Sequence, residues 1–252
     1  MTYFAVENLA VNFGGIRAVD GISFEVKKGE VFTIIGPNGA GKTTVFNLIS
    51  RIYQPTSGRI VFEDKNIASE PPYKITALGI ARTFQNIELF GNSTVLGNLL
   101  LGRHVHRSTG LLAELMFLPS VRAAEVAHRK RVEEVIDFLD LQPYRNSLIS
   151  GLSYGVRKVV ELGRALATDP KLLLLDEPSS GLNVEETEDM VFWIRDICRL
   201  LGITVVMIEH DMKLVSAVSD RVLAMSYGRP LAMGKPDEVQ RHPDVVKAYL
   251  GS

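Results

Sequence analysis

One run of residues limits what this chain can fold into more than any other feature. Residues 36–44 read Gly-Pro-Asn-Gly-Ala-Gly-Lys-Thr-Thr and fit the phosphate-binding pattern G-x-x-x-x-G-K-[ST] at every position. Residues 30–35 before it have the apolar character of a short buried strand, and residues 45–49 after it suit a helix. The alternative is a Gly-rich turn with a solvated lysine. The order of strand, loop and helix favours the phosphate-binding loop.

The chemistry of this loop follows from its residue types. Gly36, Gly39 and Gly41 let the backbone wrap closely around an anion with its N–H groups pointing inward. The start of the following helix adds partial positive charge. We expect Lys42 to reach the β- and γ-phosphates and the Thr43 hydroxyl to hold Mg²⁺. The predicted nucleotide contacts in the loop are Asn38, Gly39, Ala40, Gly41, Lys42, Thr43 and Thr44.

Composition narrows the class of protein. The chain has 252 residues, of which 46% are hydrophobic and 23% charged, as in globular proteins that bury a sizeable core. The formal net charge of −1 gives no sign of a basic nucleic-acid binder. The single cysteine, Cys198, fits a reducing compartment. We see neither a signal peptide at the N-terminus nor an apolar run of about 18 residues, so any membrane work would need a partner chain.

The pattern of apolar residues predicts an α/β protein. Residues 1–35 and 58–62 alternate as strands of an antiparallel β region, whereas residues 93–165 are mostly spaced as helices. Residues 172–175 and 203–208 are apolar on both faces, as parallel strands inside a sheet are, and residues 185–201 form an amphipathic helix between them. We therefore predict one domain over residues 1–252. Its β and phosphate-loop core spans 1–85 and 161–252, with a helical subdomain inserted at 86–160.

Two acidic residues, Asp176 and Glu177, directly follow the strand at 172–175. Ligands of parallel sheets bind at the carboxyl ends of the strands, and neighbouring residues there point in opposite directions. We assign Asp176 to holding Mg²⁺ through water and Glu177 to polarising the attacking water as a general base. The alternative is an acid pair that only balances a helix dipole.

Two further polar residues come at comparable places. His210 ends the strand at 203–208 and would hydrogen-bond the γ-phosphate or position the water, the alternative being a structural histidine. Gln85 opens the helical insertion, and its amide oxygen could ligate Mg²⁺ while sensing the γ-phosphate.

Taken together, these motifs resemble the nucleotide-binding subunit of an ABC transporter, and the resemblance covers essentially the whole chain. Besides the residues above, it rests on residues 152–155, which resemble the signature motif of that family, and on residues 180–183, which resemble its dimer loop. The resemblance implies that Phe13 stacks on adenine, although as a strand residue alone it reads as core. It also implies that Ser153 and the Gly155 N–H reach the γ-phosphate of a nucleotide bound to a second subunit. Two subunits would then sandwich two ATP molecules head to tail, closing on ATP and opening after hydrolysis.

Within the family, the chain looks like the ATPases of branched-chain amino acid importers. The features that carry this narrower resemblance are residues 81–86, 89–90, 181–183, 209–213 and 248–251, and the long insertion around 102–130. That branch also includes ATPases for urea or short amides, and no residue separates these solutes. Two departures are Val156-Arg157 after the signature glycine, where glutamine is usual, and Asn183 in place of aspartate.

The resemblance also implies the partners. We expect ABC transmembrane permease subunits, a second ATP-binding subunit that is either the same chain or a paralogue, and indirectly an extracytoplasmic solute-binding protein. The chain would lie peripherally on the cytoplasmic face of the inner membrane. Two other classes are less consistent with the sequence. A soluble ABC ATPase acting on DNA or ribosomes would carry coiled coils, two cassettes or a basic surface, and a non-hydrolysing regulatory subunit would not need Glu177.

Two parts of the helical insertion lead to further expectations. The basic residues at 104–107 and 122–131 read as a solvated helical face, because His104 and His106 lack the acidic or thiol partners of a metal site. Residues 86–98 follow Gln85 directly and include apolar Leu89 and Phe90. We expect them to line the groove that receives a coupling helix of the membrane subunit.

Overall fold

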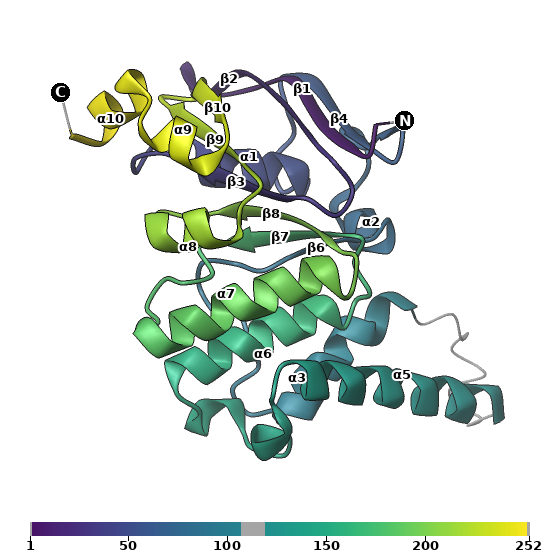
Figure 1. The fold of residues 1–252 in the computed structure, drawn as a ribbon. Coiled ribbons are helices and arrows are strands. Elements are labelled where there is room, and N and C mark those ends of the chain that lie inside the picture. The colour runs from purple at the N-terminus through teal and green to yellow at the C-terminus, as the bar shows by residue number, and fades with distance from the viewer. Residues whose placement is uncertain (1, 107–118, 251–252) are drawn as a thin grey trace. The chain divides into compact units, whose positions relative to one another are not determined.

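The structure is a computed structural model that describes residues 2–106 and 119–250. The chain divides into two compact units, one made of residues 1–85 and 171–252 and the other of residues 86–170. Figure 1 shows their elements, and each unit is described by itself.

The first unit contains two sheets. The four-stranded sheet is antiparallel, in the order β2-β1-β4-β5, and the six-stranded sheet has the order β10-β9-β3-β8-β7-β6. The strands are β1 (Phe4–Phe13), β2 (Ile16–Val26), β3 (Val31–Ile35), β4 (Ser57–Phe62), β5 (Lys65–Asn66), β6 (Ile80–Arg82), β7 (Leu172–Asp176), β8 (Thr204–Ile208), β9 (Arg221–Ser226) and β10 (Arg229–Gly234). The helices are α1 (Lys42–Ile49), α2 (Pro72–Ala77), α7 (Val184–Arg199), α8 (Met212–Val218), α9 (Pro236–Gln240) and α10 (Pro243–Leu250).

The antiparallel sheet follows from alternation and turn chemistry. Gly14 and Gly15 link β1 to β2 with φ of 51° and 91°, the left-handed backbone that a two-residue hairpin turn needs and that glycine adopts readily. Along β1, Val6, Leu9 and Val11 are buried. The predicted antiparallel region is therefore present in β1, β2 and β4, whereas residues 31–35 form β3 of the other sheet and pair there in parallel.

In the six-stranded sheet, β3, β6, β7, β8 and β9 are mutually parallel and only β10 runs antiparallel. Every residue of β3, β7 and β8 is buried, as parallel strands covered on both faces require. Since β3, β8 and β7 are neighbours and point the same way, the loops after them meet at one edge of the sheet. This arrangement confirms the predicted parallel core.

The main core of this unit lies between the two sheets, where α1 is enclosed (Figure 1). Val45, Phe46, Leu48 and Ile49 of α1 are fully buried and join the cluster formed by the inner faces of both sheets. Burying one such side chain stabilises a fold by about 1.5–3 kcal/mol. The helix that follows the phosphate-binding loop is thus held by packing along most of its surface.

The second unit is helical, as predicted for residues 93–165. Its helices are α3 (Val95–Gly102), α5 (Pro119–Phe138) and α6 (Tyr154–Leu166), with short 3-10 turns at η1 (Arg103–His106), η2 (Gln142–Tyr144) and η3 (Ile149–Gly151). Helix α3 packs against both α5 and α6. The unit extends to residue 170, since α6 continues to Leu166 and the following Asp169 is bound by side chains of this same unit.

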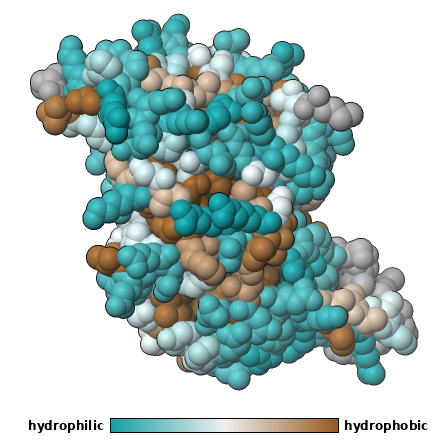
Figure 2. Space-filling view, viewed as in Figure 1, coloured by the Kyte–Doolittle hydropathy of each residue, from teal (hydrophilic) through white to brown (hydrophobic). Residues whose placement is uncertain are grey.

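The surface visible in Figure 2 is mostly hydrophilic, with apolar side chains gathered in smaller groups. Within the two described stretches of chain, no helix combines the length and the apolar character needed to cross a bilayer.

Candidate functional site

The loop between β3 and α1 requires glycine at two positions for steric reasons. Gly36 has φ of 152°, and a Cβ there would lie 2.1 Å from the carbonyl oxygen of Met225. Gly41 has φ of 95°, and a Cβ there would lie 2.5 Å from the carbonyl oxygen of Ala18. The close approach of neighbouring strands, as well as the curvature of the loop, therefore selects glycine.

The turn between β9 and β10 supports the loop through its backbone. The Gly228 N–H donates to the Ala40 carbonyl at 2.9 Å, and the Gly228 carbonyl accepts from the Asp20 N–H at 2.8 Å. Tyr227 precedes Gly228 with φ of 46° and a largely exposed ring. The β9–β10 hairpin thus holds the phosphate-binding loop in place just before the start of α1.

Lys42 is buried at the start of α1. Its ammonium donates to the carbonyl oxygens of Gly36 at 2.7 Å and Pro37 at 3.1 Å. Burial lowers the pKa of Lys42, and the negative charges of Glu177 and Asp176 partly oppose that shift. Both carboxylates therefore act electrostatically on the lysine that the sequence assigns to the phosphates.

A cavity of about 560 Å³ lies over the loop and collects most of the predicted residues. A volume of this size is in the range of small-molecule sites. The predicted residues that line it are Asn38, Gly39, Ala40, Gly41, Lys42, Thr43, Thr44, Gln85 and Glu177. Ile16, Arg17, Ala18, Tyr227 and Gly228 complete the lining.

Glu177 and Gln85 meet across this cavity. The Gln85 amide nitrogen donates to a carboxylate oxygen of Glu177 at 2.9 Å. Glu177 has φ of 50°, unusual for a residue with a side chain, and its N–H donates to the Ile208 carbonyl at 2.9 Å. Such a left-handed backbone costs on the order of 1–3 kcal/mol and persists where the surroundings impose it, often at functional sites.

Asp176 is almost fully buried at the end of β7. One of its oxygens accepts from the Arg82 guanidinium at 2.8 Å, an ion pair inside the protein. The sequence assigns no role at the site to Arg82, which falls only within the residues 81–86 of the narrower resemblance. The available signal was a charged residue after the apolar Ile80 and Ala81, three positions before Gln85.

His210 is exposed, and its neighbour Glu209 is the buried group at the end of β8. Glu209 accepts from the Ser179 N–H at 2.9 Å and from the Ser179 hydroxyl, and also from the backbone N–H groups of His210 and Asp211 at 2.7 and 3.0 Å. It thereby joins the loop after β7 to the loop after β8. The sequence analysis did not identify Glu209 as a site residue. The available signal was its place at the carboxyl end of β8, which corresponds to that of Asp176 at the end of β7.

Phe13 ends β1, where its ring meets Tyr53 edge to face with centroids 5.0 Å apart. Both rings are partly exposed. Among the described residues, Phe13, Asp176 and His210 do not line the 560 Å³ cavity. Phe13 therefore forms a partly exposed aromatic pair with Tyr53 at the surface. It is not the core residue that its place in a strand alone suggests.

Ser153 and Gly155 belong to the helical unit. Ser153 caps α6, with its hydroxyl accepting from the Val156 N–H at 3.3 Å. Gly155 is buried in the first turn of that helix. Their expected contact with a nucleotide on another subunit remains a prediction.

The basic stretch of the insertion is not simply a solvated face. Within it, Arg131 bonds the carboxylate of Asp169 and His106 lies 2.9 Å from the Thr168 carbonyl. Arg103, just before the stretch, bonds Asp169 as well. Burial raises the pKa of Asp169, but the hydrogen bonds from Arg103 and Arg131 outweigh it and hold the pKa below its ordinary value. These basic side chains therefore connect η1 and α5 to the segment that follows α6. Residue 107 and the insertion up to 118 lie outside the described residues.

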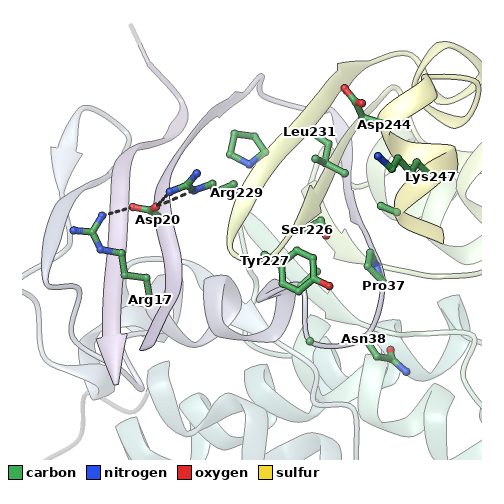
Figure 3. A pocket seen from close by; sticks show the side chains of 14 residues that line it. Arg17, Asp20, Pro37, Asn38, Ser226, Tyr227, Arg229, Leu231, Asp244 and Lys247 are labelled. Carbon is green, nitrogen blue, oxygen red and sulfur yellow. Dashed lines mark hydrogen bonds and ion pairs between the residues drawn. The ribbon is translucent and has the colours of Figure 1, made fainter. Parts of the chain in front are cut away.

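A second cavity, of about 790 Å³, adjoins the first and is shown in Figure 3. Asp20 stands between Arg17 and Arg229 and accepts from each at 2.9 Å. The hydrogen bond from Arg229 is the main cause that holds the pKa of Asp20 below its ordinary value. A single carboxylate thus bonds both guanidinium groups at the edge of this cavity.

The residues around the first cavity suit Mg²⁺ together with a nucleotide. Mg²⁺ takes oxygen ligands and is commonly held by one or two carboxylates and by substrate phosphates. Thr43 and Gln85 line the cavity with Lys42, and Asp176 is close enough to act on the charge of Lys42. The residue types that Mg²⁺ prefers, a hydroxyl, a side-chain amide and a carboxylate, are thus present near Lys42.

Comparisons with known proteins agree with this geometry. The family model described as ABC transporter matches residues 19–180, and that of the branched-chain amino acid ATP-binding cassette transporter matches residues 229–252. The chain is 40% identical to the high-affinity branched-chain amino acid transport ATP-binding protein LivG of Salmonella typhimurium, over 98% of this chain and 97% of the relative. It is 41% identical to BraF of Pseudomonas aeruginosa, the protein of the same description, over 98% and 96%.

Solved structures give the same result for the fold. A nucleotide-free ATP-binding cassette from an ABC transporter superimposes with a TM-score of 0.86 at 32% identity, over the full length of both chains. The ADP conformation of MJ1267, another ATP-binding cassette of an ABC transporter, gives 0.85 at 32% identity, again over both full lengths.

Proposed function

This chain belongs to the ABC transporter family of ATP-binding subunits, and we propose that it hydrolyses ATP to drive the import of branched-chain amino acids. The observation that carries the proposal is the single cavity in which the residues 38–44, Gln85 and Glu177 meet. The printed descriptions of LivG and BraF support the solute.

We propose the following division of roles at the nucleotide. The backbone N–H groups of residues 38–44 and the Lys42 ammonium would hold the phosphates, which requires Lys42 to exchange its bonds to the Gly36 and Pro37 carbonyls for phosphate oxygens. Thr43, Gln85 and Asp176 would hold Mg²⁺. The ion would supply charge neutralisation at the β- and γ-phosphates. Phe13, beside Tyr53, would stack on the adenine.

Glu177 is the proposed general base. It lines the cavity, and its carboxylate is oriented by the Gln85 amide, so it can accept a proton from a water aligned with the γ-phosphate. His210 would add a hydrogen bond to the same phosphate. Its backbone N–H is anchored by Glu209, which supports a fixed position for the loop that carries it.

A second ATP-binding subunit completes the proposed enzyme. Ser153 and Gly155 sit at the first turn of α6, whose N–H groups and partial positive charge suit an anion. We propose that they contact the γ-phosphate on the partner subunit, so that ATP joins two subunits and hydrolysis releases them. The partner is either a second copy of this chain or a paralogue.

The proposed membrane partners are permease subunits, contacted from the cytoplasmic face of the inner membrane. Phe90 is exposed and Leu89 is half-buried, in the segment that follows Gln85. Replacing Phe90 with glutamate should uncouple uptake from hydrolysis and leave the basal ATPase rate unchanged, whereas normal uptake would remove this surface from the proposal. An extracytoplasmic solute-binding protein would deliver the solute.

Uptake tests the function as a whole. Cells that lack this chain should lose uptake of labelled leucine, isoleucine and valine, and the wild-type chain but not Lys42→Ala should restore it. Uptake that is unaffected by the loss would contradict the branched-chain assignment. The same strains would then be assayed with urea and short amides, the alternative solutes of this branch.

A further inference from the structure

Arg82 occupies an unusual position for a cation. It is the last residue of β6, its side chain is only 7% exposed, and it follows two buried apolar residues. A buried cation is costly unless it is paired and hydrogen-bonded. The contacts that stabilise the buried Arg82 guanidinium therefore indicate its role.

The guanidinium bridges two elements of the nucleotide site. One terminal nitrogen donates to Asp176 at 2.8 Å, and the other donates to the Asn47 amide oxygen at 2.8 Å and to the Ser50 hydroxyl at 2.9 Å. Asn47 lies in α1 and Ser50 caps its end. The Ser50 hydroxyl itself donates to the Phe46 carbonyl, so its oxygen is available as the acceptor for Arg82.

Two aromatic rings lie against the same guanidinium. Its central carbon is 5.5 Å from the centroid of Phe46 and 5.0 Å from that of Phe84, both within the range of a cation–π contact. The rings shield the group from water, which strengthens its interaction with Asp176. Phe84 is also the residue directly before Gln85, so this packing fixes the start of the segment that carries Gln85.

These contacts connect all three proposed Mg²⁺ ligands. Thr43 is in the first turn of α1, the helix to which Arg82 bonds; Asp176 is its ion-pair partner; and Gln85 follows the ring stacked on it. The planar guanidinium donates to Asp176 through one terminal nitrogen and to Asn47 and Ser50 through the other. Its rigid geometry therefore fixes the distance between the Asp176 carboxylate and α1, which a flexible lysine ammonium does not.

We propose that Arg82 is a positioning residue that sets the affinity of the nucleotide site for Mg²⁺. It aligns the Asp176 carboxylate with Thr43 on α1 and so holds the ligand set in one arrangement before the ion enters. The inference rests on the proposed binding of ATP with Mg²⁺ at this site. Residues that orient metal ligands typically change metal affinity by about 10–100-fold when they are lost.

The test compares nucleotide binding with and without Mg²⁺. A fluorescent ATP analogue is titrated into wild type, Arg82→Lys and Arg82→Met, first in EDTA and then at increasing Mg²⁺. We expect Arg82→Met to bind the analogue in EDTA within about 3-fold of wild type, while the Mg²⁺ concentration that half-saturates the Mg²⁺-dependent binding rises about 10-fold. Arg82→Lys, which keeps the charge without the planar guanidinium, should show most of that rise.

Two results would overturn the proposal. One is an unchanged Mg²⁺ requirement in Arg82→Met. The other is an equal loss of binding in EDTA and in Mg²⁺, which would mean that Arg82 only supports the fold. If wild type itself binds the analogue without any effect of Mg²⁺, the proposed function fails instead, so the two failures are distinguishable.

A milder variant keeps the test decisive if Arg82→Met does not fold. The double variant Asn47→Ala with Ser50→Ala leaves the Arg82–Asp176 pair in place but removes its attachment to α1. It should raise the half-saturating Mg²⁺ concentration about 3-fold or more, with binding in EDTA retained. No change in the Mg²⁺ requirement of this variant would also refute the proposal.

Discussion

Gln85 and Glu177 are joined by a hydrogen bond in the cavity above the phosphate-binding loop. The amide nitrogen of Gln85 donates to the carboxylate of Glu177 at 2.9 Å. The two residues come from loops after different parallel strands, β6 and β7. The side chain expected to sense the γ-phosphate thus orients the side chain expected to activate water. Any displacement of the segment that carries Gln85 would change the position of the proposed base.

Replacing Gln85 with glutamate should therefore damage hydrolysis more than binding. Two carboxylates at this distance repel each other, so Glu177 would be displaced from the water position. We expect the rate of phosphate release to fall about 10–100-fold while ATP affinity changes by less than about 5-fold. Steady-state hydrolysis together with equilibrium nucleotide binding measures the two effects. Asn86→Ala, one position along the chain, is the control and should leave both values near wild type.

Gly36→Ala should disrupt the phosphate-binding loop. The added methyl group would lie 2.1 Å from the Met225 carbonyl oxygen, so the loop or β9 must shift. We expect a loss of about 3 kcal/mol in the free energy of unfolding and no measurable ATP binding. Urea unfolding and nucleotide titration test this. Gly14→Ala is the matched control: its backbone is also left-handed, but nothing lies within 4 Å of the new atom. It should cost only about 1–2 kcal/mol and keep ATP binding. Equal effects of the two substitutions would contradict the steric argument.

The Asp169 ion pairs predict a pH-dependent stability of the helical unit. The pKa of Asp169 lies below its ordinary value of 3.8, so the pairs stabilise the fold above that pH, and the contribution is lost as pH falls through the lowered value. Asp169→Asn should lower the free energy of unfolding by about 1 kcal/mol at pH 7, because solvent screens these partly exposed ion pairs. The gap between wild type and variant should narrow below pH 3.8.

Unfolding at several pH values, followed by a probe in the helical unit, measures this gap. Asp140→Asn is the control, because Asp140 is an exposed residue of the same unit and should shift stability by no more than about 0.5 kcal/mol. A difference between Asp169→Asn and wild type that stays constant from pH 7 to pH 3 would show that the ion pairs are not its source.

Glu209→Gln should weaken both loops that Glu209 joins. One carboxylate oxygen accepts from Ser179 and the other from the N–H groups of His210 and Asp211. Glutamine keeps one accepting oxygen, but its amide nitrogen cannot accept the bonds made at the other, so the connection between the two loops is lost. We expect a loss of about 3 kcal/mol in stability and a clear fall in hydrolysis, because His210 loses its anchor. Ser179→Ala, which removes only the hydroxyl contact, should cost about 1 kcal/mol. A Glu209→Gln protein as stable as wild type would refute this role.

The sequence was sufficient to predict the architecture and the main parts of the site. The phosphate-loop pattern specifies its own strand and helix, and fully apolar runs such as residues 172–175 mark parallel strands covered on both faces. Since ligands bind at the carboxyl ends of such strands, the residues after them could be predicted to lie near the loop. Glu177 and Gln85 do line the cavity with residues 38–44.

The long-range polar partners could not be predicted. Arg82 and Asp176 are 94 positions apart in the sequence, and their pairing depends on the side-by-side placement of β6 and β7. The convergence of Arg103 and Arg131 on Asp169 likewise depends on how the helices pack, so the pattern of the basic residues at 122–131 indicates only a solvated face. The environment of Phe13 could not be predicted for the same reason, because its contact partner Tyr53 is far away in the sequence.

The most direct test of the account is the Glu177→Gln variant, measured for phosphate release and for ATP binding in the same preparation with Mg²⁺. Glutamine keeps the size of the side chain but cannot accept a proton from water. The account predicts that hydrolysis falls by at least about 100-fold while ATP binding stays within a few-fold of wild type. Undiminished hydrolysis by Glu177→Gln would contradict the assignment of Glu177 as the general base and, with it, the proposed mechanism.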